Sequence, residues 1–360
     1  MNKVQSEVLF EVMRTLVAVV IALFLALIII FLVSEEPWQA LNYFMLGPLS
    51  TVRRFGNVLE MTIPFIFTGL AVCVMFQAKQ FNMIAEGAFF IGGLAAAIIA
   101  VKLTLPLGIH PAAAVICGAL AGGVAGFIPG ILKTRWNANE LVSSLMLNYV
   151  LLYFGLFLLN YLIRDPNAGN IASFTLNPTA KLQIFVPGTR IHWGIFVAAL
   201  MIVLVYYFLY RSKWGYVLRM TGLNQKFAEY SGMNTLNVTI YSQVIGGLIA
   251  GVGGATEILG MYDRFQWQSL PGYGFDGIIV AILARQNPLL VPVAAVFLAY
   301  LRIGADIMSR MSDVPSEVVS VIQAIMIMLI AAYSFLAAWR HRVIVKQSKE
   351  NLALQAGREN

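Results

Sequence analysis

The sequence predicts an all-α polytopic membrane protein, and three of its features support this prediction. Hydrophobic residues make up 59% of the 360-residue chain and charged residues only 11%, whereas soluble domains carry about 25% charged residues. The mean hydropathy is +0.79. Long uncharged runs recur along the chain, and a helix needs about 20 mainly apolar residues to cross a bilayer. We attribute the formal charge of +7 to basic cytoplasmic loops rather than to a nucleic-acid surface, so no nucleic-acid partner is expected.

The uncharged runs predict about ten transmembrane segments in one membrane domain over residues 1–360. They cover residues 15–34, 61–78, 87–101, 111–132, 141–163, 192–210, 230–256, 277–284, 286–301 and 318–339. The first run is longer than the apolar core of a signal peptide and has no convincing cleavage site, so we expect an uncleaved helix. Pro64 should bend the second segment.

The sequence predicts an interrupted helix between residues 277 and 301. The uncharged run at 277–284 is too short to span, and Arg285, Asn287 and Pro288 separate it from the next run. Broken helices are tolerated at membrane depth only against protein or a watery cavity. The distribution of Lys and Arg places both termini in the cytoplasm if this region crosses twice or re-enters. Residues 340–360 would then be a cytoplasmic tail.

Two connections are longer than the others. Residues 164–190 are rich in Asn, Pro and Thr and are predicted to lie outside the cell. Residues 211–234 are predicted to lie inside, and their mixture of basic and apolar residues favours a short amphipathic helix along the membrane face.

Two segments far apart in the chain resemble each other. "FNMIAEGAFFIGGLAAAI" and "YGFDGIIVAILARQNPLL" each place an aromatic residue and then an acidic residue ahead of small and branched apolar residues. The predicted topology runs them in opposite directions across the membrane. Inverted repeats with interrupted helices are typical of transporters, with the substrate route at the repeat interface. We therefore predict an inverted repeat.

No motif for catalysis or metal binding is found. The chain has no GxxxxGK[ST] phosphate loop, no HExxH and no GxSxG. Its three histidines, His110, His192 and His341, lack metal-ligand spacing. We therefore expect no catalytic residues, no metal site and no cofactor of the chain's own. Cys73 and Cys117 lie in apolar segments, which argues against a disulfide framework.

Acidic residues at membrane depth are the candidates for function, because a buried charge there is costly and marks a pathway or a partner. They are Glu60, Glu86, Glu140, Glu257 and Asp276. We interpret Glu60 as lying near the outer surface, close to Arg53 and Arg54, and Glu140 as interfacial. Glu86 and Asp276 lie in glycine-flanked, interrupted segments, where a pathway role and a structural role both stay open. The dense glycines at 118–126 and 246–260 favour close helix packing.

Four blocks in the same order resemble one known family. The blocks are "QFNMIAEGAFFIGG", "NELVSSLMLNYV", "TGLNQKFAEYSGMN" and "GYGFDGIIVAILARQNPL". Together they resemble the permease subunits of nucleoside-type ABC importers, a family of nucleoside and simple-sugar permeases related to ribose permeases. The resemblance extends from Phe81 to Leu289 and rests on the blocks together, since a single "AEG" is a weak signal.

The resemblance implies a non-catalytic permease subunit of an ATP-driven importer in the plasma or inner membrane, which moves nucleosides by alternating access. ATP would be bound by separate cytoplasmic ATPase subunits. The other implied partners are a second permease subunit, homologous or identical, an extracellular substrate-binding lipoprotein and membrane lipid. Residues 211–234 would contain the coupling loop that docks on the ATPase.

The resemblance also assigns residues. The implied substrate-pathway residues are Phe81, Asn82, Glu86, Asn148 and Asp276. The implied coupling residues are Gly222, Asn224, Ala228 and Gly232. Phe227 departs from the family pattern, which has alanine there, and this departure bears on the fit to the ATPase.

Two alternatives stay open. A ribose-type simple-sugar ABC permease shares the family, although the "LMLNYV" block and the long 164–190 connection argue against it. An ion-coupled secondary transporter would use Glu86 or Asp276 as a proton site, and dependence of uptake on ATP or on a proton gradient separates it from the ABC permease.

Overall fold

The computed structural model describes residues 28–315, 317–318, 321 and 324–325. The chain divides into two compact units, one of residues 48–303 and one of residues 1–47 together with 304–360. The single-domain prediction for 1–360 therefore stays a prediction. Within the described residues the regular structure is helical, with two isolated β-bridges and no extended strand. Most of the predicted segment 15–34, most of 318–339 and the predicted tail 340–360 lie outside these residues.

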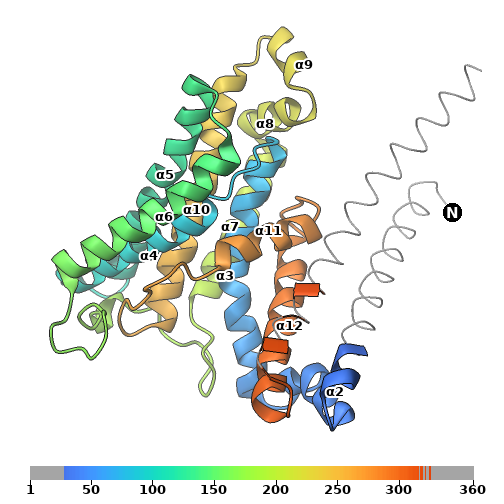
Figure 1. The fold of residues 1–360 in the computed structure, drawn as a ribbon. Coiled ribbons are helices and arrows are strands. Elements are labelled where there is room, and N and C mark those ends of the chain that lie inside the picture. The colour runs from blue at the N-terminus through green and yellow to red at the C-terminus, as the bar shows by residue number, and fades with distance from the viewer. Residues whose placement is uncertain (1–27, 316, 319–320, 322–323, 326–360) are drawn as a thin grey trace, which may run out of the picture. The chain divides into compact units, whose positions relative to one another are not determined.

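The larger unit is built from long apolar helices (Figure 1). They are α3 (Val52–Gln77), α4 (Ala85–Lys102), α5 (Ile109–Trp136), α6 (Glu140–Leu158) with a π-helical turn (Leu159–Ile163), α7 (Gly194–Arg211) and α10 (Thr235–Met261). The unit also holds α8 (Lys213–Leu223), α9 (Gln225–Tyr230), α11 (Tyr273–Leu283) and most of α12 (Val291–Met311). Among the described residues seven helices are long and apolar enough to cross a membrane, which confirms the all-α polytopic fold.

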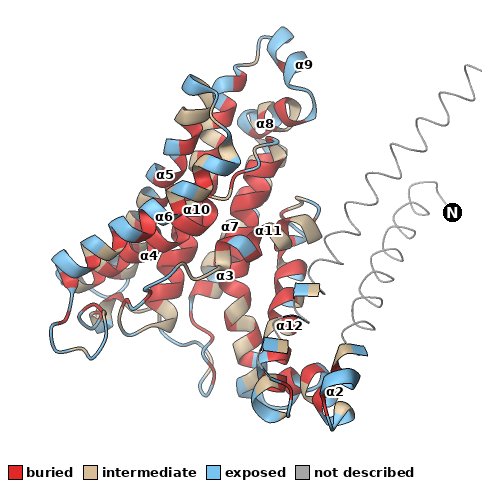
Figure 2. Cartoon of the chain, in the orientation of Figure 1, coloured by how far each residue is buried: buried red, intermediate tan, exposed pale blue. Residues whose placement is uncertain are grey.

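The buried core of this unit lies along α3, α4 and α10, which Figure 2 shows largely in red. Glycines let the backbones of α4, α5 and α10 touch. A Cβ atom added at Gly92 would lie 2.5 Å from the Cα of Gly251, and one at Gly122 would lie 2.8 Å from the same atom. The predicted role of these glycine runs in close helix packing is confirmed.

The outer faces of α6 and α7 are apolar and exposed. Tyr153 and Phe157 on α6 and Leu200 and Tyr207 on α7 are each more than half exposed. Apolar side chains in such numbers need a hydrocarbon environment, and the bilayer supplies it. These two helices therefore form part of the lipid-facing surface.

The predicted interruption lies between α11 and α12. Arg285 and Gln286 both have positive φ angles, 51° and 59°, a conformation that side-chain-bearing residues rarely adopt. The Gln286 N–H donates to the Ala281 carbonyl at 2.9 Å, and its own carbonyl accepts from Gln77 Nε2 at 3.0 Å. The break therefore packs against the last residue of α3 and is held by hydrogen bonds.

The two ends of the larger unit differ. Helices α8 and α9 lie at one end, and the connection from α6 to α7 lies at the other (Figure 1). We call these the α8–α9 end and the loop end.

The predicted amphipathic helix at 211–234 is in fact two short helices, and a side-chain cap begins each of them. Ser212 Oγ accepts from the Gly215 N–H at 3.0 Å, and Asn224 Oδ1 accepts from the Phe227 N–H at 3.1 Å.

The smaller unit contains α2 (Pro37–Met45) and the last residues of α12. The Asp313 carboxylate links its two chain segments, because it accepts from Ser34 Oγ at 2.7 Å and from the Glu35 N–H at 2.6 Å. These bonds lower the pKa of the Asp313 carboxyl.

Candidate functional site

Glu86 lies in the first turn of α4, and its carboxylate binds the N-terminus of α11. It accepts from the N–H groups of Gly272 and Gly274, both at 2.6 Å, and from that of Phe275 at 3.3 Å. Helix N-termini carry unpaired N–H groups and a partial positive charge, so a carboxylate is favourable there. Gly272 has φ +88°, which allows the turn into α11.

Asn148 on α6 orders the start of α4. Its Oδ1 accepts from the Gly87 N–H at 3.0 Å and its Nδ2 donates to the Met83 carbonyl at 2.9 Å. Because Asn148 is fully buried, these bonds replace water for two backbone groups.

Asn82 is also fully buried, and it connects the α3–α4 loop to α10. Its Oδ1 accepts from the Ile84 N–H at 2.7 Å, and its Nδ2 donates to Gln243 Oε1 at 2.8 Å. Phe81, its neighbour, is 59% exposed and packs its ring 5.2 Å from that of Phe76. Phe81 therefore lies apart from the buried polar residues that the resemblance grouped with it.

Asp276 lies in the first turn of α11, and its electrostatic field reaches the Glu86 carboxylate. Its Oδ1 pairs with Arg302 on α12 at 2.6 Å. Its Oδ2 is buried and has no hydrogen-bond partner in the part of the chain that the structure describes. Glu86 and Asp276 thus come together at the start of α11, Asn148 binds the neighbouring turn of α4, and Phe81 is separate.

The two acidic residues interpreted as structural differ in outcome. Glu140 pairs with Lys133 at 3.0 Å, as an interfacial residue is expected to do. Glu60 is expected near the outer surface, close to Arg53 and Arg54. It is 7% exposed inside α3, and the basic residue with which it interacts electrostatically is Arg190. The sequence could not predict this basic neighbour of Glu60, because Arg190 is distant in the chain and is brought to α3 by the connection between α6 and α7.

The sequence identified Glu257 on α10 as an acidic residue at membrane depth but assigned it no role. Its side chain is 1% exposed, and its Oε1 accepts from the Tyr273 hydroxyl at 3.4 Å. An acidic residue inside a predicted transmembrane segment was the available signal. The surrounding glycine run was interpreted only as a feature of close helix packing. Glu257 belongs to a buried polar group that the predicted site did not include.

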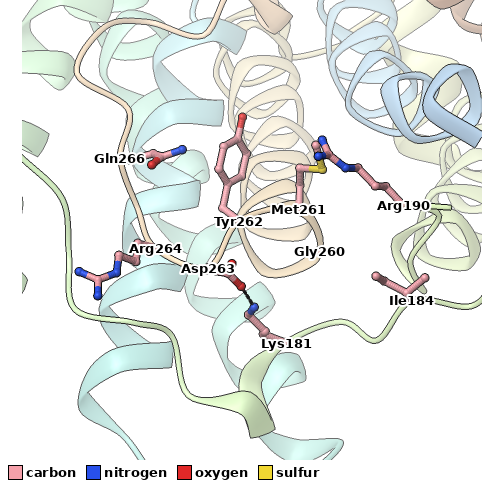
Figure 3. Close-up of a pocket in the computed structure, with 9 residues that line it drawn as sticks. All are labelled: Lys181, Ile184, Arg190, Gly260, Met261, Tyr262, Asp263, Arg264 and Gln266. Carbon is pink, nitrogen blue, oxygen red and sulfur yellow. Dashed lines mark hydrogen bonds and ion pairs between the residues drawn. The ribbon is translucent and has the colours of Figure 1, made fainter. Parts of the chain in front are cut away.

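A cavity of about 640 Å³ opens at the loop end of the larger unit, between residues 181–190 and the chain that leaves α10. Figure 3 shows Tyr262, Arg190 and the paired side chains of Lys181 and Asp263 around it. Lys181 lowers the pKa of the Asp263 carboxyl. Close by, Arg264 Nη1 binds Asp165 Oδ2 at 2.5 Å. The hydrogen bond from the Asn167 N–H, and after it the Arg264 pair, lowers the pKa of the Asp165 carboxyl. Ion pairs therefore hold the rim of the cavity.

The four implied coupling residues shape the α8–α9 end. Gly222 allows α8 to contact α3, since an added Cβ would lie 3.0 Å from the Gln77 carbonyl carbon. Asn224 caps α9, Ala228 is fully buried, and Gly232 has φ +78°. Around them the apolar side chains of Leu223, Phe227 and Tyr230 are 73%, 53% and 91% exposed.

In the described part of the chain, seven apolar helices and a half-length helix whose buried N-terminus binds a carboxylate define a polytopic membrane protein of the kind used for transport. Comparison with known proteins gives the family. The chain belongs to the family described as the branched-chain amino acid transport system / permease component, which matches residues 54–331.

Three curated relatives are similar over most of their length. The guanosine ABC transporter permease protein NupP of Bacillus subtilis (strain 168) is 35% identical, over 79% of this chain and 83% of its own. The glucose ABC transporter permease protein TsgB13 of Haloferax volcanii is 30% identical, over 85% and 83%. The nucleoside ABC transporter permease protein NupB of Lactococcus lactis subsp. cremoris is 27% identical, over 89% and 91%.

Proposed function

We propose that this chain is the membrane-spanning permease subunit of an ATP-driven importer of nucleosides. The observation that carries the proposal is its 35% identity to a guanosine permease over four-fifths of the chain, 79%. The chain would perform no catalysis and bind no cofactor, and separate ATPase subunits would bind and hydrolyse ATP. It would lie in the plasma or inner membrane with both termini in the cytoplasm.

The centre of the larger unit suits a substrate without net charge. The N-terminus of α11 is the position at which a broken transporter helix commonly binds an anion, and here the Glu86 carboxylate already fills it. A nucleoside, which is neutral, fits this arrangement better than a phosphorylated one.

The predicted pathway residues keep distinct roles in this proposal. Glu86 and Asn148 hold the starts of α11 and α4 beside the route, and Asn82 holds the loop before α4. Asp276, whose Oδ2 has no hydrogen-bond partner among the described residues, would present that oxygen to the route. Phe81, which is exposed near the α8–α9 end of α3, would lie at the cytoplasmic mouth.

The α8–α9 end suits docking to an ATPase. The buried and capped positions Gly222, Asn224, Ala228 and Gly232 make the two helices a compact unit, and exposed apolar side chains surround them. Such a patch marks a contact surface. ATP binding by the partner would move this unit and open the route alternately to each side. The remaining proposed partners are a second permease subunit, an extracellular substrate-binding lipoprotein and membrane lipid.

A second candidate function is import of a simple sugar. It is favoured by the 30% identity to a glucose permease over 85% of the chain. An ion-coupled transporter with Glu86 or Asp276 as the proton site is less well supported, since both carboxylates already bind protein groups.

The deciding experiment begins by purifying the chain gently from its native membrane with the proteins that accompany it. The complex is reconstituted in vesicles with its binding protein, and uptake of labelled guanosine, ribose and glucose is measured with and without ATP. We expect a co-purifying ATPase and ATP-dependent guanosine uptake. Uptake of sugars alone would establish the second candidate. Transport by a chain without partners on a proton gradient would contradict both.

A further inference from the structure

Glu60, Glu257 and Tyr273 bring three different helices together at one buried point. Glu60 lies on α3, Glu257 on α10 and Tyr273 at the start of α11. The two carboxyl groups interact electrostatically, and the Tyr273 hydroxyl contacts Glu257 Oε1 at 3.4 Å. Glu257 is 1% exposed, and its Oε2 has no partner among the described residues. A buried oxygen without a hydrogen bond is costly, so this one needs an explanation.

A buried donor without a partner lies on the same side of α10. His192 is fully buried, and its Nδ1 accepts from the Gly194 N–H at 3.1 Å. In the neutral ring the proton is then on Nε2, which has no acceptor within the described ranges. The ring of His192 packs against Gly260, one turn of α10 beyond Glu257. An unpaired acceptor and an unpaired donor therefore lie a helical turn apart.

This polar group adjoins the 640 Å³ cavity at the loop end. Tyr262 and Arg190 line the cavity, and Tyr262 interacts electrostatically with both Glu257 and Glu60. Arg190 does the same with Glu60. Figure 3 shows the Tyr262 hydroxyl and the Arg190 guanidinium on the same side of the pocket, away from the Lys181–Asp263 pair. Gly260 lines the cavity and also contacts the His192 ring, so the buried polar group lies directly behind the cavity wall.

We propose that Glu60, Glu257, Tyr273 and His192, with Tyr262 and Arg190 at the rim, form an outer subsite that binds the vicinal hydroxyl groups of a ribose ring. The inference rests on the proposed nucleoside import, in which a binding protein would deliver the nucleoside to this end. Carboxylate oxygens accept from two adjacent hydroxyls, and imidazole N–H donates to one of them. The Tyr262 ring offers the base an apolar face.

Other ligand classes fit the same groups less well. Two carboxyl groups disfavour an anion. A metal ion is disfavoured because, in the part of the chain that is described, no group of three or more His, Cys, Asp or Glu side chains is placed to hold one. The cavity volume falls in the range of about 300–1,000 Å³ common for small-molecule sites, which accommodates a nucleoside.

The test compares nucleosides that differ by one hydroxyl group. The purified permease–ATPase complex is reconstituted with saturating binding protein and ATP, and initial uptake of inosine, 2′-deoxyinosine and 3′-deoxyinosine is measured. We expect Glu257→Gln to lower inosine uptake about tenfold, because the amide oxygen lacks the negative charge that strengthens a hydrogen bond from the ribose hydroxyl. The same variant should lower uptake of the deoxy analogues less, because each lacks one of the two hydroxyls, so that the preference for the ribose narrows.

Two further variants keep the test decisive. Glu140→Gln makes the same chemical change at the interfacial Lys133 pair and should leave all three rates unchanged. Tyr273→Phe removes only the hydroxyl near Glu257 and should also weaken the preference for the ribose over its deoxy analogues. If Glu257→Gln does not assemble with the ATPase, the Tyr273 variant alone tests the subsite.

The outcomes separate the two proposals. Wild-type inosine uptake with an unchanged ribose preference in the Glu257 and Tyr273 variants would overturn the subsite and leave nucleoside import standing. Absence of any ATP-dependent nucleoside uptake by the wild-type complex would overturn the proposed function itself, and the ribose ligand with it.

Discussion

At the scale of single residues, Glu86 explains how a charged side chain is accommodated inside a membrane protein. The carboxylate is fully buried, yet it accepts from the N–H groups of Gly272, Gly274 and Phe275. Those N–H groups would otherwise be unpaired, because the first turn of a helix has no internal acceptors. The Glu86 carboxylate and the N-terminus of α11 therefore satisfy each other's hydrogen-bonding groups.

We predict that Glu86→Ala destabilises the protein strongly. Each buried N–H left without an acceptor costs about 1–3 kcal/mol, so the total should be several kcal/mol, and Glu86→Gln, which keeps one acceptor oxygen, should lose less. The measurement is thermal unfolding of the detergent-solubilised complex, with transport assayed in parallel. Glu140→Ala, which removes a partly exposed pair worth about 0–1 kcal/mol, is the control. Full stability and transport in Glu86→Ala would contradict the capping role.

His192, which precedes α7, predicts a dependence of stability on pH. Burial lowers the pKa of this ring to about 4, while the unfolded chain protonates it below a pH of about 6.5. The stability is thus fully present above pH 6.5 and is lost as the pH falls toward 4, by about 2 kcal/mol at pH 5 relative to pH 7. Thermal unfolding at both values measures the loss. His192→Gln, which cannot take up a proton, should unfold at nearly the same temperature at both, after allowance for other groups.

At the scale of helices, glycine decides how close α5 and α10 come. A Cβ atom at Gly122 would lie 2.8 Å from the Cα of Gly251, so backbone rather than a movable side chain blocks it. The sequence predicted this packing from the density of small residues alone. It did not predict which glycine meets which, since that depends on the relative rotation and height of two helices.

We predict that Gly122→Val separates α5 from α10. The added atoms meet backbone, and overpacking of this kind costs about 1–3 kcal/mol. The melting temperature of the purified protein should fall, and the yield of assembled complex with it. Gly169→Val is the matched control, because a Cβ at Gly169 meets no atom within 4 Å. Equal melting temperatures for the two variants would show that the contact tolerates larger residues.

The interruption before α12 was predictable because Arg285, Asn287 and Pro288 break an apolar run. Its geometry was not. Two successive positive φ angles and the bond from Gln77 Nε2 to the Gln286 carbonyl depend on α3, which is distant in sequence. Local sequence therefore located the break, and tertiary contacts determined its shape.

At the scale of the whole molecule, the four sequence blocks indicated the family because each forms part of one connected structure. They supply the starts of α4, α6 and α11 and the α8–α9 end. The blocks could not reveal that Glu60 interacts electrostatically with Arg190, or that the Tyr273 hydroxyl binds Glu257, since these interactions join segments that no single motif contains. The inverted repeat stays a prediction.

We predict that Phe227→Ser weakens association with the ATPase without unfolding the permease. Phe227 is 53% exposed on α9, so its removal should cost little stability, while loss of an aromatic side chain at an interface commonly costs about 1–2 kcal/mol, near tenfold in affinity. Titration of the solubilised permease with the ATPase measures the effect. Phe174→Ser, 45% exposed at the loop end, should bind as the wild type does. Equal affinity of both variants for the ATPase would show that Phe227 does not belong to the docking surface.

The bond between Glu86 and the start of α11 has a consequence for engineering. Because the acceptor on α4 and the donors at Gly272, Gly274 and Phe275 come from opposite halves of the chain, a chimera that recombines two relatives between these segments inherits one partner from each parent. The close fit of Gly274 against the backbone of Ala85 tightens this requirement. Recombination breakpoints that keep residues 85–87 and 272–276 from the same parent should yield folded hybrids.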